Sequence, residues 1–566
     1  MHHHLSLRGK LIIMLSVMSS LFLVALDQTI IATALGKIVE DFNAFSSLSW
    51  IVTAYLLTTT VTVPIAGKLS DLYGRRILLL VGVAIFFAGS LLSGMSANIT
   101  HLILARAVQG IGGGIITANA FTIIGDLFAA RERGKWQGLI GAVFGLSSVV
   151  GPLLGGWLTD GHNILGLTTN WRWTFFINVP IAIMAFVALL IFCPPLRHDK
   201  KPQVDYLGAM LLTIALATLV LAVDNTESIF KDLLTATGWS LLTLRIVMFS
   251  IVAAASSLFV WVEAKAKEPI LPLQLFKNRN FVMVIGIAGL FGSAFMGAIL
   301  YLTQFNQQAF GATPTQSGLM LLPMVAGLMF SSIASGQVIS KTGKYKIFMQ
   351  VGIVLATAMI ALLTTLTPAS TYLYEAIIMS LLGLGLGVVM PVMTLVVQNE
   401  FKHHELGVAT SSSQLFRSLG STIGIAVFGA ILTAGLVANI NTSELSKSPY
   451  ISAIAKNPEI KRIGELNDVN TMLSLNMPDV KQQISEHFEQ SIEQLPSAER
   501  EESLRNFNSK QAEFSNTIAT AYSNSLRDIF KISAVLMTIA GVFVFNIKET
   551  PLSKARPGDS PGLKDD

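Results

Sequence analysis

Long apolar segments recur along the entire chain, and most are bounded by charged or polar residues. About 20 apolar residues are enough for a helix to cross the ~30 Å hydrocarbon core of a bilayer. Apolar length and flanking charge predict fourteen such spans, at residues 11–35, 48–67, 77–97, 102–125, 136–158, 174–193, 207–223, 241–262, 281–303, 315–340, 347–366, 372–397, 407–437 and 525–547. The pattern therefore predicts an all-α integral membrane protein.

Basic residues are concentrated in the connectors on one side of these spans. They are Lys68, Arg75, Arg76, Arg131, Arg133, Lys135, Arg197, Lys200, Lys201, Lys265, Lys267, Lys277, Arg279, Lys341, Lys344 and Lys346. The short connectors on the other side hold few, namely Lys37, Arg172, Lys231 and Arg245. By the positive-inside rule we expect both termini in the cytoplasm. We expect the protein itself in the inner (cytoplasmic) membrane.

The segment 438–523 is polar, charged and far longer than a typical connector. Apolar residues recur in it at helical spacing on both sides of Pro496, at Val480, Ile484, Phe488, Ile492 and Leu495 and then at Leu504, Phe507, Phe514, Ile518 and Tyr522. We predict two amphipathic helices, a hairpin outside the membrane. It either packs on itself or at the interface, or covers an exit path, or docks an envelope partner.

Composition agrees with a polytopic protein. Of 566 residues, 52% are hydrophobic and only 13% are charged, and the mean hydropathy is +0.61. The net charge of +5 does not indicate a nucleic-acid partner, because in such a protein the placement of Lys and Arg sets orientation. The one cysteine, Cys193, excludes an internal disulfide and offers no basis for structural zinc.

A short motif occurs twice, each time at a hairpin on the basic side. Gly67 to Arg76 follows the second predicted span, and Gly336 to Tyr345 follows the tenth, with glycines at equal spacing. A duplicated six-helix unit explains this repeat. We therefore divide the chain into 1–200 as the N-terminal six-helix bundle, 201–280 as two inserted helices and a cytoplasmic linker, 281–437 with 524–548 as the C-terminal six-helix bundle, 438–523 as the extracytoplasmic loop and 549–566 as a cytoplasmic tail.

Several motifs together resemble a known family over nearly all the chain. They are Leu26-Asp27-Gln-Thr29-Ile-Ile, the loop Gly67 to Arg76, Arg106-Ala-Val-Gln109-Gly110, the run from Gly145 to Gly156, and the run from Trp171 to Pro180. In order and spacing they are similar to the fourteen-helix drug:proton antiporter branch of the major facilitator superfamily. The resemblance implies a major facilitator fold of two six-helix halves plus two inserted helices.

The resemblance also implies a function. It implies efflux of lipophilic drugs by alternating access, in exchange for protons and without a cofactor or metal. The open alternative is an exporter of anionic, lipid-like or metabolite compounds, working alone or with an envelope partner. A receptor or a membrane enzyme is disfavoured, because the sequence has no carboxylate pair, metal cluster, nucleophile elbow or phosphate loop in a suitable context. We expect a monomer.

Charged residues within the spans are candidates for proton coupling. A carboxylate such as Asp27 in an apolar helix is energetically unfavourable unless it is protonated, paired or facing water. Arg106 enters the fourth span by one to two turns, so we expect it at a similar depth. A nearby guanidinium favours the ionised carboxylate and burial favours the neutral one, so a conformational change can load and release a proton. Glu375, near an outer end, is the main further candidate.

Two motifs are candidates for conformational control. By resemblance, the loop is a latch between the halves on the cytoplasmic side, with Gly67, Asp71, Gly74, Arg75, Arg76 and the acidic partner Asp126. The fifth span carries the family's antiporter motif, with Gly145, Gly151, Pro152, Gly155 and Gly156. The glycines permit close helix approach, and Pro152 is either a bend or gate or a tolerated membrane proline. Ordinary helix packing and orientation explain some of these residues equally well.

Polar and aromatic groups within spans are candidates to line a substrate cavity. We choose Trp50, Tyr55, Gln109, Asn119, Tyr301, Gln304, Gln307 and Arg417. With 20 Met and 32 Phe residues in the chain, an adaptable apolar cavity is expected. Substrates are then lipophilic and most simply cationic, although Arg417 keeps anionic substrates open.

Overall fold

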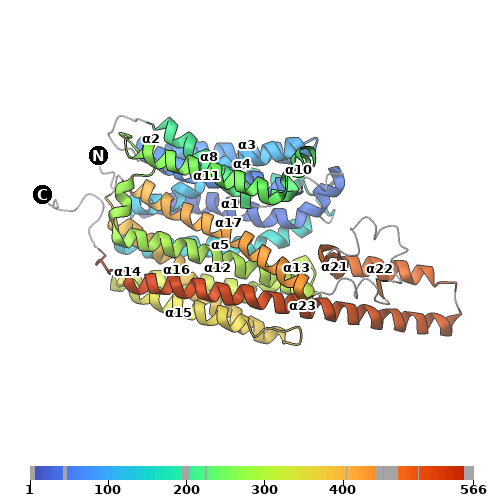
Figure 1. The fold of residues 1–566 in the computed structure, drawn as a ribbon. Helices are drawn as coiled ribbons and strands as arrows, with labels where there is room; N and C mark the ends of the chain where they lie inside the picture. The colour runs from blue at the N-terminus through green and yellow to red at the C-terminus, as the bar shows by residue number, and fades with distance from the viewer. Residues whose placement is uncertain are drawn as a thin grey trace.

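The computed structural model of the protein describes residues 7–42, 48–159, 161–164, 166–193, 204–223, 226–402, 405–439, 450–451, 469–494 and 496–552. Within these residues, fourteen helices are long and apolar enough to cross a membrane, which confirms the predicted number. The helices run roughly parallel or antiparallel in one elongated bundle (Figure 1). Parts of the predicted loop and tail, including Leu495, lie outside the described residues.

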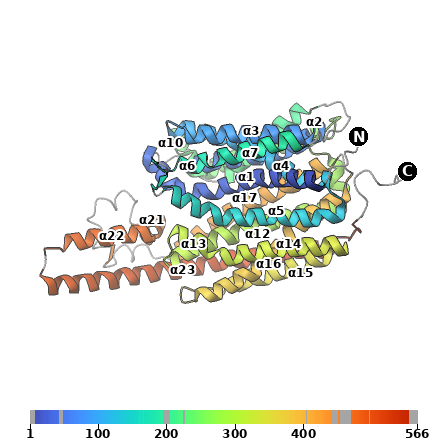
Figure 2. The same ribbon diagram turned by 180° about the vertical axis from the view of Figure 1, so that it is seen from behind.

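The first six spans pack together. They are α1 (Leu7–Phe42), α2 (Leu48–Tyr73), α3 (Arg75–Gly94), α4 (Ile99–Leu127), α5 (Ala130–Thr159) and the pair α6 (Trp173–Phe176) and α7 (Asn178–Phe192). A short antiparallel pair, β1 (Asn163–Ile164) and β2 (Leu167–Thr168), precedes α6. Helix α4 packs against α2 and α3, while α1 packs against α5 and α7. Figure 2 shows α3, α7, α1 and α5 on one side of the molecule. We call this group the first half.

The last six spans form a second group, which we call the second half. They are α12 (Arg279–Ala309), the pair α13 (Pro314–Met320) and α14 (Leu322–Thr342), α15 (Lys346–Leu363), α16 (Tyr372–Glu400), α17 (Leu406–Asn439) and α23 (Ser497–Asn546). The predicted span 315–340 is divided at Leu321, and Pro323 follows at the start of α14, where a missing N–H is tolerated. Helix α12 packs against α17 and α23, and α14 packs against α16.

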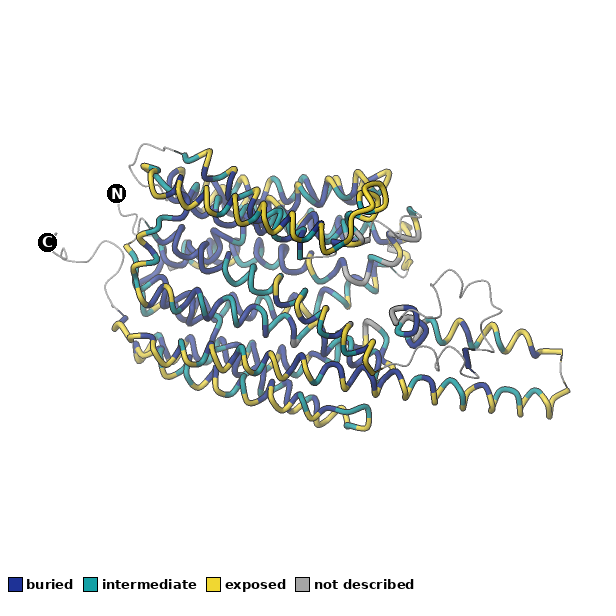
Figure 3. Tube along the Cα trace, in the orientation of Figure 1, coloured by how far each residue is buried: buried dark blue, intermediate teal, exposed yellow. Residues whose placement is uncertain are grey.

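Two further spans, α8 (Tyr206–Val223) and α11 (Leu241–Glu263), pack on each other, and α8 also contacts α2. The short helices α9 (Thr226–Ile229) and α10 (Lys231–Thr237) connect them, and the 3₁₀ helix η2 (Leu273–Lys277) leads into α12. Helices α7 and α11 have wide exposed faces rich in large apolar residues, as helices that face lipid require. Figure 3 shows buried positions lining the inside of the bundle and exposed positions on its outermost helices.

The segment before the last span differs from the prediction. The expected second amphipathic helix and the expected span 525–547 are one continuous helix of 50 residues, α23. Its N-terminal part projects beyond the bundle beside α22 (Pro478–Ser491), with α21 (Val469–Leu475) at the base (Figure 1). Phe488 of α22 stacks on Phe507 of α23, with ring centroids 4.0 Å apart. The regularly spaced apolar residues of α22 and of the N-terminal part of α23 thus pack against each other in a projecting pair of helices.

The bundle has two ends. We call the end where α1 begins at Leu7 and α23 ends at Asn546 the termini end, and the opposite end, where α22 projects, the hairpin end. The halves meet mainly where α5 packs on α14 and α2 packs on α17. A Cβ atom added to Gly336 would lie 2.4 Å from the carbonyl oxygen of Gly134, so glycine is needed for this close approach.

Candidate functional site

A buried ion pair lies inside the first half. Asp27 of α1 and Arg106 of α4 are 0% and 1% exposed, and Arg106 Nη1 lies 2.5 Å from Asp27 Oδ2. Asp27 is 15 residues before the end of α1 at Phe42, or about 22 Å along the helix. The structure therefore brings together the two charges that sequence reasoning paired.

Neutral amides and a hydroxyl complete the surroundings of this pair. Gln109 Nε2 donates to Asp27 Oδ1 at 2.8 Å and to Ser90 Oγ at 2.7 Å, and its Oε1 accepts from Arg106 Nη1 at 2.7 Å. Asn178 Nδ2 donates to Asp27 Oδ1 at 3.3 Å. Both carboxylate oxygens thus accept hydrogen bonds, which satisfies the rule for a buried charge. Gln109 belongs to this network, although sequence reasoning placed it among substrate contacts.

Aromatic rings hold the guanidinium of Arg106 from the other side. Its Cζ lies 4.3 Å from the ring centroid of Tyr55 and 5.7 Å from that of Phe175. Cations are attracted to such ring faces, more strongly where water is absent. Arg106 Nε also donates to the carbonyl of Ile51 at 3.4 Å. The arginine is therefore held in place by α2, α4 and α6 together.

Glycines allow the helices that carry these groups to approach closely. A Cβ atom on Gly110 would lie 2.4 Å from the carbonyl oxygen of Tyr55, and one on Gly151 would lie 2.0 Å from Thr29 Oγ1. Thr29 Oγ1 donates to the carbonyl of Ser147 at 2.9 Å, which joins α1 to α5 two residues from Asp27. The expected antiporter motif thus packs α5 against the helix that carries the carboxylate.

The remaining residues of that motif lie along α5. Gly145 faces Met329 of α14, and a Cβ atom on Gly318 of α13 would lie 3.5 Å from Pro152. The hydroxyl of Thr159 donates to the carbonyls of Gly155 and Gly156. The motif therefore contacts both halves.

A second polar cluster lies at the termini end. Arg75 donates to Asp71 and Ser70, and its Nε lies 2.8 Å from Asp126 Oδ2. Asp71 in turn accepts from the backbone amides of Gly407 at 3.2 Å and Val408 at 2.9 Å. These amides belong to the first turn of α17, in the other half, where a carboxylate is favoured by the helix dipole. Asp71 therefore links the two halves.

The other residues expected in the latch have different surroundings. Gly67 faces Ser411 of α17, and Gly74 has φ 95°, a left-handed turn between α2 and α3 that glycine adopts readily. Arg76 instead donates to the carbonyl of Leu190 at 2.6 Å, inside the first half. This bond of Arg76 thus lies within the first half.

Sequence reasoning missed one cross-connection at this end. The guanidinium of Arg133, which is 8% exposed, donates to three backbone carbonyls, those of Gly125 at 2.8 Å, Phe128 at 3.1 Å and Gln398 at 2.8 Å. The first two lie at the C-terminal end of α4 and the third at that of α16, in the other half. Gln398 Nε2 also donates to the carbonyl of Phe121 at 2.8 Å. A cation here complements the negative ends of two helices.

The candidate substrate residues do not converge on one site. Tyr55 and Gln109 belong to the ion-pair network, and Trp50 is half-buried at the start of α2. Asn119 donates to the carbonyl of Ile115 on its own helix at 2.8 Å. Tyr301 donates to the carbonyl of Ile425 at 3.0 Å, Gln304 accepts from Tyr522, and Gln307 is half-buried in α12. Packing and helix-to-helix bonds account for most of them.

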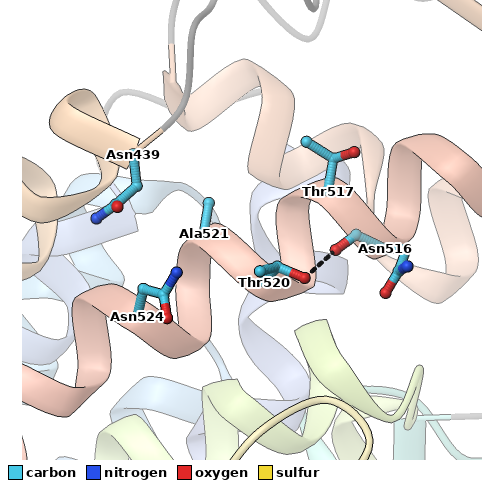
Figure 4. Close-up of a pocket in the computed structure, with 6 residues that line it drawn as sticks. All are labelled: Asn439, Asn516, Thr517, Thr520, Ala521 and Asn524. Atoms are coloured by element: carbon cyan, nitrogen blue, oxygen red, sulfur yellow. Dashed lines mark hydrogen bonds between the residues drawn. The ribbon is translucent and has the colours of Figure 1, made fainter.

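Cavities occur elsewhere in the structure. A polar hollow of about 310 Å³ at the hairpin end is lined by Asn439, Asn516, Thr517, Thr520, Ala521 and Asn524 (Figure 4). An apolar groove of about 550 Å³ runs between α15 and α23. Across the described residues, no group of three or more His, Cys, Asp or Glu side chains could hold a metal ion.

Comparison with known proteins establishes the family. The sequence profile described as Major Facilitator Superfamily matches residues 17–425, and the chain belongs to this superfamily. It is a membrane transporter and not an enzyme.

Particular relatives refine this statement. The chain is 36% identical over 547 residues to the multidrug transporter protein MdtP of Bacillus subtilis (strain 168), covering 95% of this chain and 93% of that protein. It is 32% identical over 434 residues to multidrug resistance protein 3 of the same organism, covering 77% and 81%. These relatives support drug efflux.

Solved structures share the fold. The human organic anion transporter MFSD10 matches with a TM-score of 0.54 at 16% identity, over 75% of this chain and 93% of that one. The proton:xylose symporter XylE also matches with a TM-score of 0.54, at 13% identity over 76% and 90%. At these identities the likeness concerns the fold alone.

Proposed function

We propose that the protein exports lipophilic, most simply cationic, compounds in exchange for protons, by alternating access between its two halves. The observation that carries this proposal is the buried pair of Asp27 and Arg106. The carboxylate of Asp27 is the chemical group that would bind a proton. It lies on α1, which packs against α5, and α5 in turn packs against α14 of the second half, so a change at Asp27 would be transmitted to the contact between the halves.

Water is needed for a proton to reach Asp27. Gln28, the next residue, is exposed although it lies within a span. An amide facing hydrocarbon is unfavourable, so Gln28 is better explained by a water-filled space between the halves. Protonation of Asp27 would then remove the partner of a buried guanidinium, which costs about 3–5 kcal/mol. That free energy favours a rearrangement of the first half.

The free energy of the proton gradient is large enough to drive export of a compound against its concentration gradient. One proton moving through 100 mV releases about 2.3 kcal/mol, and tenfold accumulation of a compound requires about 1.4 kcal/mol. By the positive-inside rule the termini end faces the cytoplasm, so the hairpin end faces outward in the inner membrane. No cofactor is needed for such a cycle.

The test uses proteoliposomes with a pH dye inside and an imposed proton gradient. Ethidium serves as the lipophilic cation, fluorescein as the anion and chloramphenicol as the uncharged compound. We expect a compound to trigger proton flux, and Asp27→Asn to abolish that flux while the thermal unfolding temperature changes little. Asp41→Asn is the matched control, because Asp41 lies on the same helix with its side chain 53% exposed. Proton-driven export by Asp27→Asn would refute the assignment.

One observation favours the alternative of an anionic substrate. Arg417 lies well inside α17, and its Nε and Nη2 both donate to Gln414 Oε1, at 3.0 and 2.7 Å. Among the described residues no carboxylate pairs with it. A cation without a counter-charge within a span would attract an anionic group. Flux triggered by fluorescein but not by ethidium would favour this reading.

A further inference from the structure

The hairpin end of α12 is rich in side-chain amides, two of which join it to α23 and to the end of α21. Gln304 Oε1 accepts from the Tyr522 hydroxyl of α23 at 2.6 Å. Gln308 Oε1 accepts from Asn476 Nδ2, next to α21, at 2.8 Å. The residue midway between these two glutamines, Asn306, faces neither of those elements.

Asn306 lies beside the carboxyl group of Glu375 in the first turn of α16. Both side chains are 0% exposed. Among the described residues, neither oxygen of Glu375 and neither side-chain polar atom of Asn306 has a partner at hydrogen-bond geometry. Buried polar groups are rarely left in this state, so the pair needs a functional or structural explanation.

Among the described residues, no charged side chain pairs with Glu375. Of the side chains that α12, α14, α15, α17 and α5 present to α16 within the described residues, none forms an ion pair with it. The titratable neighbour is Tyr372 on the same helix, whose hydroxyl donates to the carbonyl of Met320. An ionised carboxylate buried without a partner is very unfavourable, so this environment favours the neutral acid.

Asp27 and Glu375 thus have different environments. Asp27 in the first half is paired with a cation, while Glu375 in the second half faces only an amide. Two carboxyl groups in such contrasting environments can take different roles in one protein.

We propose that Glu375, with Asn306, is a second proton-binding site in the second half, so that one transport cycle moves two protons. This inference rests on the proposed function and deepens it by giving the stoichiometry. When the proton leaves Glu375 for water, the charge left behind cannot stay buried against Asn306. The hairpin end of α12 then separates from α16, and reprotonation from water on the other side of the membrane allows the two helices to close again.

The experiment measures the number of protons per substrate from the point of zero net flux. Proteoliposomes with the membrane potential clamped to zero receive a fixed gradient of ethidium, or of fluorescein if the anion is the compound carried. The pH difference that stops net movement then gives the stoichiometry directly. We expect two protons per substrate in the unmodified protein and in Glu375→Asp, and one in Glu375→Gln. Glu513→Gln, the same change at an exposed hairpin residue, should leave the value at two.

Equal values for the unmodified protein and Glu375→Gln would overturn the inference. The absence of any proton-dependent flux in the unmodified protein would instead refute the proposed function. If Glu375→Gln does not transport, infrared spectroscopy of the purified protein tests instead whether Glu375 holds a proton. A carbonyl band of a protonated carboxylic acid at neutral pH that disappears in Glu375→Gln supports the inference, and a spectrum without that band overturns it.

Discussion

Removing the guanidinium of Arg133 should weaken closure of the termini end. Of its three hydrogen bonds to carbonyls, only the one to Gln398 crosses between the halves, so only that one is lost on opening. A hydrogen bond involving a charged group contributes about 1.5–3 kcal/mol net. At about 1.4 kcal/mol per factor of ten, Arg133→Gln should raise the ratio of open to closed molecules roughly ten- to a hundredfold.

The assay is a distance measurement between spin labels. Labels at Tyr73 and Lys402, which are exposed at the termini end on opposite halves, report opening after Cys193→Ser removes the native thiol. Lys135→Gln is the matched control, because it removes a positive charge two residues further along the same helix, where the side chain is exposed. An Arg133→Gln population no more open than that of Lys135→Gln would refute the reasoning.

Two further predictions concern other charged residues. Asp71→Asn removes the anion at the start of α17, worth about 0.3–1 kcal/mol, and should slow turnover more than it changes substrate affinity. Weakened affinity at unchanged turnover, measured in proteoliposomes, would contradict a latch. Burial lowers the pKa of Lys481 below its ordinary 10.5, so the unfolded hairpin binds more protons than the folded one. The stability of the hairpin should therefore rise as pH approaches 10.5. The measurement is hydrogen exchange of the hairpin amides, corrected for the intrinsic exchange rates, and Lys481→Met should abolish the rise. A rise that persists in Lys481→Met would exclude Lys481 as its source.

Hydropathy located the spans because apolar length is a direct requirement of the bilayer, and the same reasoning singled out Asp27 and Arg106 as costly charges. It did not find Ser90 or Asn178, because neutral polar residues are common in spans and nothing in their spacing marks them as partners of Asp27. Arg133 was read as one more basic connector residue. Its role depends on where two helices from different halves end, which a local pattern does not contain.

The length of α23 was also missed, although the sequence held a signal. A change from polar to apolar composition near residue 525 was taken as the start of a new element. Yet between Ser497 and Ala540 there is neither proline nor glycine to end a helix. Composition marks where a helix enters the bilayer, and it does not mark where the helix begins.

Because α23 is one continuous helix, any tilt of its membrane-spanning part also moves its projecting part. From Tyr522, which is bonded to Gln304, back to Ser497 the helix extends about 38 Å. If the helix stays straight, a tilt of about 10° within the bilayer would displace its far tip by roughly 7 Å. A small tilt in the second half would thus become a large displacement outside the membrane. A molecule that immobilised the tip of α23 would oppose that tilt and slow transport.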